Sequence, residues 1–110
     1  MAGLGGLSAE VVDEIRGVVS RFPVVMEARI FGSRAKGNFK RYSDVDIAIF
    51  GDFGVDVVME LRDELEELYV IYRFDVVHYD TLKNCDLREH IDRVGINLCR
   101  AVECFGMVEG

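Results

Sequence analysis

Residues 32–46, with the sequence GSRAKGNFKRYSDVD, decide the fold of this chain. Gly32 and Ser33 open a small, basic turn, and after ten intervening residues Asp44-Val45-Asp46 begins an alternating run that predicts a β-strand. Side chains at positions i and i+2 of a strand point to the same side, so Asp44 and Asp46 are expected to lie side by side. Two neighbouring carboxylates repel each other unless a cation lies between them. The stretch therefore predicts a phosphate-binding turn beside a site for a divalent metal ion.

The sequence on either side predicts a small mixed β-sheet flanked by helices, an α/β (α+β) fold, in a single domain spanning residues 1–110. Ser8 is a suitable N-cap, and apolar residues at three- and four-residue steps predict helices. We expect helices at about 9–21, 55–69 and 86–102, a short helical turn from Ser33 to Gly37, and strands at about 25–31, 45–50 and 70–79. The expected order of elements is α-β-α-β-α-β-α.

Length and charge narrow the possible functions. A chain of 110 residues has room for one core but not for a second substrate-binding lobe. The net charge of −7 argues against direct binding of a nucleic-acid polymer. Basic residues nevertheless gather in one short stretch, which suits a small anion such as a nucleoside triphosphate: Arg34, Lys36, Lys40 and Arg41.

The chain has no apolar run long enough to span a membrane and no recognisable secretory signal at its start. Its three cysteines, Cys85, Cys99 and Cys104, form no C-x-x-C pair. We therefore expect reduced thiols and a cytoplasmic location.

A third acidic residue interrupts the predicted strand at 70–79. Alternation places Asp75 on the same side as Arg73 and Val77, and a carboxylate in an apolar strand needs a partner. If this strand lies beside the strand of Asp46, the three carboxylates can bind two Mg²⁺ ions. His78 is expected in the core, whereas His90 is expected at the surface or in an interface.

These motifs resemble those of the polymerase-β-like nucleotidyltransferase superfamily. Residues 32–49 look most like its minimal members, the MNT proteins that pair with all-helical HEPN proteins, and residues 74–82 and 87–96 are also similar to theirs. The resemblance covers roughly residues 10–98. It implies that Gly32 and Ser33 bind the β- and γ-phosphates of ATP, that Asp44 and Asp46 bind metal, and that Asp75 binds the second metal and accepts a proton. Arg34, Lys36 and Lys40 become candidate phosphate contacts.

The resemblance also implies a function, with alternatives left open. The first is an antitoxin that transfers AMP from ATP to a hydroxyl, such as that of a tyrosine, on a HEPN toxin. The second is a binding module that neutralises this toxin without catalysis, through exposed apolar positions such as Ile96, Cys99 and Phe105. Transfer to a small molecule such as an antibiotic ranks last, because the helical domain of those enzymes is missing. A homodimer is a further expectation.

Overall fold

The computed structural model describes residues 4–68 and 71–100; for residues 99 and 100 it describes the backbone only. Its core is a four-stranded sheet in the order β3-β2-β1-β4. The strands are β1 (Val25–Phe31), β2 (Val45–Gly51), β3 (Phe74–His78) and β4 (Ile96–Arg100). The helices are α1 (Ala9–Ser20), α2 (Ser33–Lys36), α3 (Val55–Leu68) and α4 (Cys85–Val94), with a 3₁₀ turn η1 at Tyr79–Thr81.

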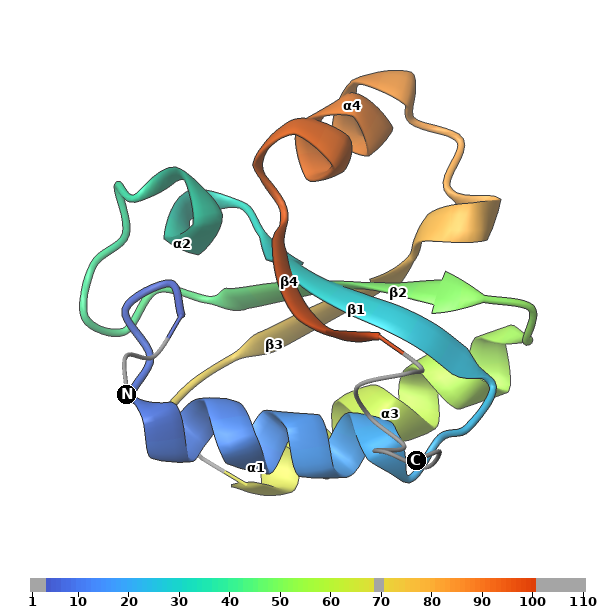
Figure 1. Ribbon diagram of the computed structural model, residues 1–110, viewed down its shortest axis with the longest axis horizontal. Helices are drawn as coiled ribbons and strands as arrows, with labels where there is room; N and C mark the ends of the chain where they lie inside the picture. The colour runs from blue at the N-terminus through green and yellow to red at the C-terminus, as the bar shows by residue number, and fades with distance from the viewer. Residues whose placement is uncertain (1–3, 69–70, 101–110) are drawn as a thin grey trace, which may run out of the picture.

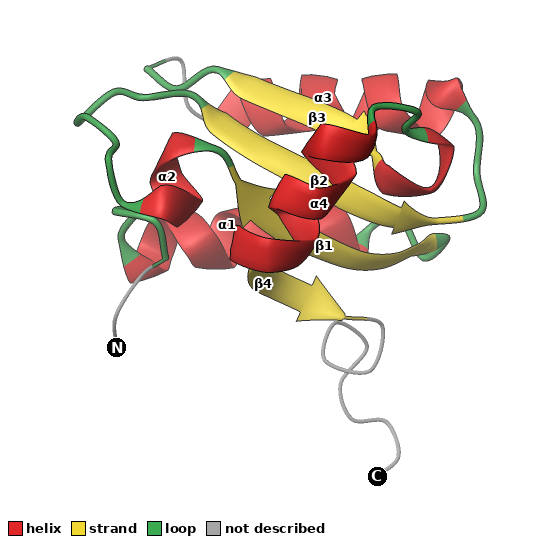
Figure 2. Ribbon diagram, turned by 90° about the horizontal axis from the view of Figure 1, so that it is seen from above, coloured by secondary structure: helices red, strands yellow, loops and turns green. Residues whose placement is uncertain are grey.

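The sheet is mixed, as predicted. β1 runs antiparallel to both β2 and β4, whereas β2 and β3 are parallel and connected through α3. α1 and α3 cover one face of the sheet, and α2 and α4 lie on the other (Figure 1). Seen from above, α4 crosses over β1 and β2 (Figure 2).

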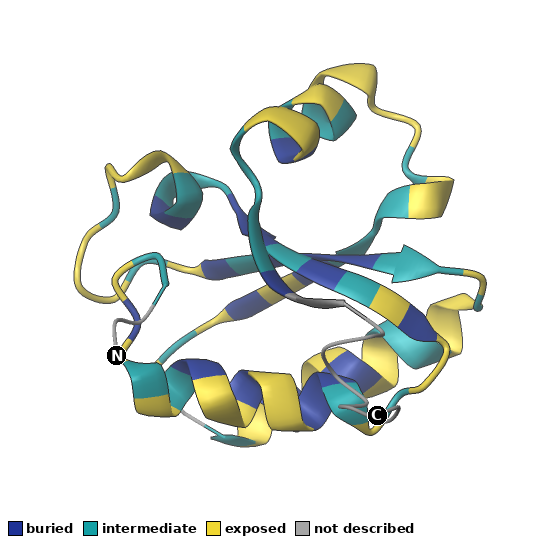
Figure 3. Cartoon of the chain, viewed as in Figure 1, coloured by how far each residue is buried: buried dark blue, intermediate teal, exposed yellow. Residues whose placement is uncertain are grey.

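Each face of the sheet carries its own apolar cluster. The larger one packs α1 and α3 against inward-facing strand residues such as Ile30 and Ile47, both fully buried. The smaller one joins Ile91 of α4 to Phe31 and Ala48. Burial follows this arrangement: the middle of the sheet is covered, and the loop between α2 and β2 is exposed (Figure 3). Because residues alternate between faces, Asp46 shares the α4 side with Ala48.

The last described segment, residues 85–100, differs most from the sequence prediction. The helix expected at 86–102 ends at Val94, and residues 96–100 form β4 instead. Gly95 stops the helix, and Leu98, which fits a helical stripe as well as a strand, is buried where β4 pairs with β1. Short apolar runs of this kind do not distinguish the two structures. Ile96 is therefore a partly buried strand residue, while the Cys99 side chain and Phe105 lie outside the described part.

The remaining elements agree closely with the prediction. Ser8 caps α1 by accepting a hydrogen bond from the amide of Val11, and α2 forms the expected short turn. The third strand begins at Phe74 rather than near residue 70. Within residues 4–68 and 71–100, no helix combines the length and apolar composition needed to cross a membrane.

Candidate active site

The turn at Gly32 connects the end of β1 to α2. Gly32 has φ 74° and ψ −151°, a conformation that residues with a side chain rarely adopt. A Cβ atom built there would lie 2.1 Å from Oδ2 of Asp46. Only glycine therefore lets the backbone of this turn approach the Asp46 carboxylate so closely.

The register of the sheet places the acidic residues together. β2 and β3 are paired so that Asp46 lies directly beside Asp75, and Asp46 pairs with Phe31 on the other side, one residue before Gly32. Asp75 is exposed and Asp46 is half-buried. Asp44, also exposed, lies immediately before β2. The sequence could not establish that β2 and β3 are neighbours, and the structure does.

Electrostatics distinguish Asp46 from the other two acids. Burial, and then the negative charges of Asp75 and Asp44, raise the pKa of Asp46 from 3.8 to about 6. Repulsion between neighbouring carboxylates and loss of water both disfavour the charged form. A cation bound among these side chains would relieve the repulsion.

Carboxylate oxygens are the ligands that Mg²⁺ prefers, so the chemistry of this group fits the ion. In the described part of the chain, however, no three acidic, histidine or cysteine side chains lie close enough to form a metal site as they stand. The acids therefore make up a suitable set of ligands rather than a preformed cage. Asp44, Asp46 and Asp75 remain the residues that we would assign to metal.

Arg34, a candidate phosphate contact, has a different environment from the one expected. It is the one buried charged residue in the described part of the chain. Its guanidinium group donates hydrogen bonds to the backbone carbonyls of Gly5, Arg41 and Ser43 at 2.8–3.2 Å. It also lies over the rings of Phe39 and Tyr72. These contacts hold the loop before Asp44 in place and engage all three guanidinium nitrogens of this candidate phosphate contact.

The other basic candidates are accessible. Lys36 and Lys40 are both exposed. Lys40, Arg41, Tyr42 and Ser43 line an open hollow of about 370 Å³ just before Asp44. This position suits the charged or aromatic part of a nucleotide, so Lys36 and Lys40 stay candidates for phosphate binding.

His90 is a site residue that the sequence did not reveal. Its Nε2 atom accepts a hydrogen bond from the amide of Gly32 at 3.0 Å, across 58 residues of sequence. The amphipathic pattern of the last helix places His90 beside Ile91 but says nothing of what it faces. Only the position of α4 over the sheet brings it to the turn.

The raised pKa of Asp46 predicts a specific pH dependence of stability. Because the folded-state pKa lies above the unfolded value, folded protein binds this proton more tightly. The resulting stabilisation is full below about pH 3.8 and is lost as pH rises through about 6. Thermal unfolding without metal should therefore show the melting temperature of wild-type protein falling, relative to Asp46→Asn, between about pH 4 and pH 7. For the control Asp52→Asn, an exposed change on the β2–α3 turn, the melting temperature should vary with pH as it does in wild type. If the melting temperature of Asp46→Asn also followed the wild-type curve, the raised pKa of Asp46 would be wrong.

The structure thus places a glycine-serine turn after β1 beside carboxylates on the adjacent strands β2 and β3. The family model "Polymerase beta, Nucleotidyltransferase" matches residues 13–103. The chain belongs to this family.

The chain is also similar to individual named proteins and solved structures. "Probable protein adenylyltransferase MntA" of Haemophilus influenzae is 38% identical over 68 residues, which cover 58% of this chain and 57% of the relative. The matched region thus spans little more than half the length of that protein. A toxin-antitoxin structure with AMP-PNP superposes with a TM-score of 0.67, at 20% identity over 94% of this chain and 88% of the other. The structure of an MNT antitoxin in complex with a tri-AMPylated Shewanella oneidensis HEPN toxin superposes with a TM-score of 0.64. The identity is 18%, and the match covers 91% of this chain and 85% of the other. At these identities the structures establish a shared fold.

Proposed function

We propose that this chain is a magnesium-dependent adenylyltransferase of the MNT antitoxin type, which transfers AMP from ATP to a hydroxyl, that of a tyrosine, on an all-helical HEPN toxin. The observation that carries the proposal is the pairing of Asp46 with Asp75 next to the close approach of Gly32. The name of the MntA relative, "Probable protein adenylyltransferase", supports AMP as the transferred group and a protein as the acceptor.

The proposed reaction forms a bond between the acceptor oxygen and the α-phosphorus and breaks the bond to the β-phosphate oxygen, so pyrophosphate leaves. Ser33 binds the outer phosphates through its hydroxyl and amide, with Lys36 and Lys40 nearby. Asp44, Asp46 and Asp75 would hold magnesium, and Asp75 would accept the proton from the attacking hydroxyl. A bound magnesium ion would supply charge neutralisation on the phosphates and a lower pKa for that hydroxyl. ATP as substrate implies that the protein acts in the cytoplasm.

A non-catalytic antitoxin is the second candidate. The described residues include several large apolar side chains that are about half exposed or more: Val24, Met26, Val55, Met59 and Ile71. Exposed apolar residues of this kind suit contact with a partner. Neutralisation by covering the toxin and neutralisation by AMP transfer are compatible, so a transfer assay has to separate them.

The test is incubation of the protein with Mg²⁺ and a candidate HEPN partner from a neighbouring gene, using ATP labelled on either the α- or the γ-phosphate. We expect the partner to gain label from α-labelled ATP only, because AMP is transferred and pyrophosphate leaves. Mass spectrometry should locate the added AMP on a tyrosine. Label from γ-labelled ATP would indicate phosphate transfer and contradict the proposal. Neutralisation without any label would favour the non-catalytic function.

A further inference from the structure

The hydrogen bond between the Gly32 amide and His90 assigns that amide a partner within the protein. An imidazole nitrogen that accepts a hydrogen bond carries no proton, so Nε2 must be the bare nitrogen and the neutral ring must carry its proton on Nδ1. The structure thus specifies one tautomer of His90. This tautomer can be observed directly.

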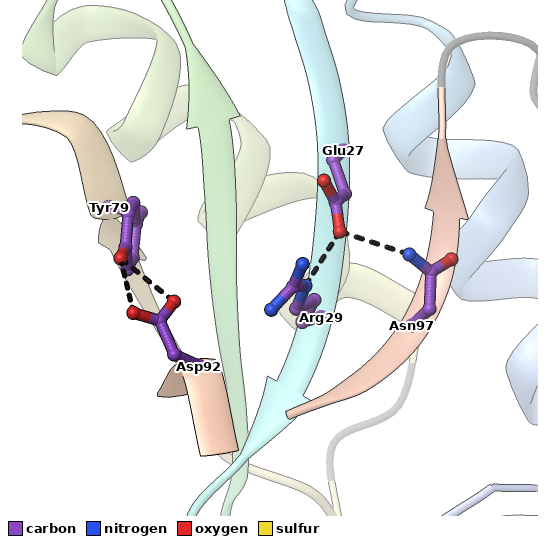
Figure 4. Close-up of polar contacts among 5 residues, drawn as sticks. All are labelled: Glu27, Arg29, Tyr79, Asp92 and Asn97. Carbon is purple, nitrogen blue, oxygen red and sulfur yellow. Dashed lines mark hydrogen bonds and ion pairs between the residues drawn. The ribbon is translucent and has the colours of Figure 1, made fainter. Parts of the chain in front are cut away.

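His90 is held firmly in position by its surroundings. The adjacent Ile91 is fully buried and packs with Phe31 and Ala48. The rings of His90 and Phe31 meet edge to face, with 6.1 Å between their centroids. Two residues further along α4, Asp92 accepts hydrogen bonds from the hydroxyl of Tyr79 at 2.8 and 2.9 Å (Figure 4). The residues that follow His90 in α4 are therefore held against the sheet and against the η1 turn.

The opposite sheet edge is fixed as well. Glu27 of β1 accepts hydrogen bonds from Arg29 and from Asn97 of β4, as the second cluster in Figure 4 shows. β4 follows α4 after a single residue, Gly95. Anchoring β4 thus also limits how far α4 can move away from the turn.

The charges around His90 favour the neutral ring. Burial lowers the pKa of His90, and the positive charges of Lys36 and Arg93 lower it further. The ring is therefore an acceptor at neutral pH. The hydrogen bond from the Gly32 amide to His90 orients the backbone at Gly32. This backbone lies against the Asp46 carboxylate and continues into Ser33.

We infer that His90 is a positioning residue of the nucleotide site: its neutral imidazole fixes the Gly32-Ser33 turn, and the Gly32 amide stays bonded to His90 when nucleotide binds. Ser33 then contacts phosphate, whereas Gly32 contributes its backbone conformation and not its amide. This inference rests on the proposed function, because it assumes that a nucleotide binds at the turn.

The test compares His90→Ala with His90→Gln. A glutamine Oε1 reaches about as far from the backbone as Nε2 of histidine and can accept the same hydrogen bond. Glu89→Ala, an exposed neighbour on α4, is the matched control. NMR of nucleotide-free protein should show the Nδ1-protonated tautomer of His90. The Gly32 amide should exchange faster in His90→Ala but not in the other two variants.

The affinity for AMP-PNP, measured with Mg²⁺, then tests whether the hydrogen bond between Gly32 and His90 matters for nucleotide binding. We expect the dissociation constant to rise about tenfold in His90→Ala, roughly 1.4 kcal/mol, and to change less than about twofold in His90→Gln and Glu89→Ala. In wild type, AMP-PNP should shift the Ser33 amide resonance and leave that of Gly32 and the His90 tautomer unchanged.

Three results would overturn the inference: nucleotide displacing His90 from the Gly32 amide, unchanged binding in His90→Ala, or equally weak binding in His90→Gln. A wild-type protein that binds no AMP-PNP would instead refute the proposed function. In that case the resonances of the nucleotide-free protein would still report whether the hydrogen bond exists. If His90→Ala does not fold, the wild-type titration and His90→Gln decide the question.

Discussion

Asp46→Asn should lower AMP transfer to the partner by roughly a thousandfold or more, equivalent to about 4 kcal/mol of transition-state stabilisation. Asparagine keeps the shape of the side chain but loses the negative charge that would hold magnesium between β2 and β3. The variant should fold normally, since removing one of three repelling carboxylates favours the folded state near neutral pH. The measurement is the rate at which the partner gains label from α-labelled ATP.

Controls for this prediction separate catalysis from binding. Asp52→Asn makes the same chemical change on an exposed turn away from the site and should keep the wild-type rate. Co-purification of Asp46→Asn with the partner would show whether the complex still forms. If Asp46→Asn transferred AMP at the wild-type rate, the assigned metal site would be wrong. If transfer were lost while the toxin stayed fully neutralised, complex formation would be sufficient for the antitoxin effect.

Arg34→Met should lower the free energy of unfolding by about 2–3 kcal/mol, because three backbone carbonyls lose a charged donor. Methionine fills much of the space of the arginine stem, so the loss reports mainly the hydrogen bonds and the contact with Phe39 and Tyr72. Urea unfolding followed by circular dichroism measures the effect. Arg34→Lys should recover only part of the stability, since an ammonium group cannot bond to all three carbonyls from one planar fork.

The same substitution at Arg41, which is exposed and lies over the ring of Tyr42, is the matched control. Arg41→Met should change the unfolding free energy by less than about 0.5 kcal/mol. If Arg34→Met were equally mild but abolished nucleotide binding, Arg34 would be a phosphate contact after all. That outcome would restore the interpretation drawn from the sequence.

Arg34 shows why residue type alone does not decide the partners of a side chain. A basic residue following a Gly-Ser turn is chemically suited both to phosphate and to backbone carbonyls. Burial decides between these partners, and burial depends on where the N-terminal segment at Gly5 and the loop ending at Ser43 pack. Lys36 and Lys40, with the same charge, are exposed.

The sequence by itself determined the local features: the capped first helix, the glycine-serine turn, the acidic pair Asp44 and Asp46 at the start of an alternating strand, and the family to which these belong. Such features depend on residues near one another in the chain, whose periodicity and turn chemistry are readable directly. Tertiary structure decided which distant residues meet: Asp75 beside Asp46, β4 in place of the end of a helix, Arg34 inside, and His90 on the Gly32 amide. These pairings arise from strand order and helix packing over the whole sheet, which no local pattern encodes.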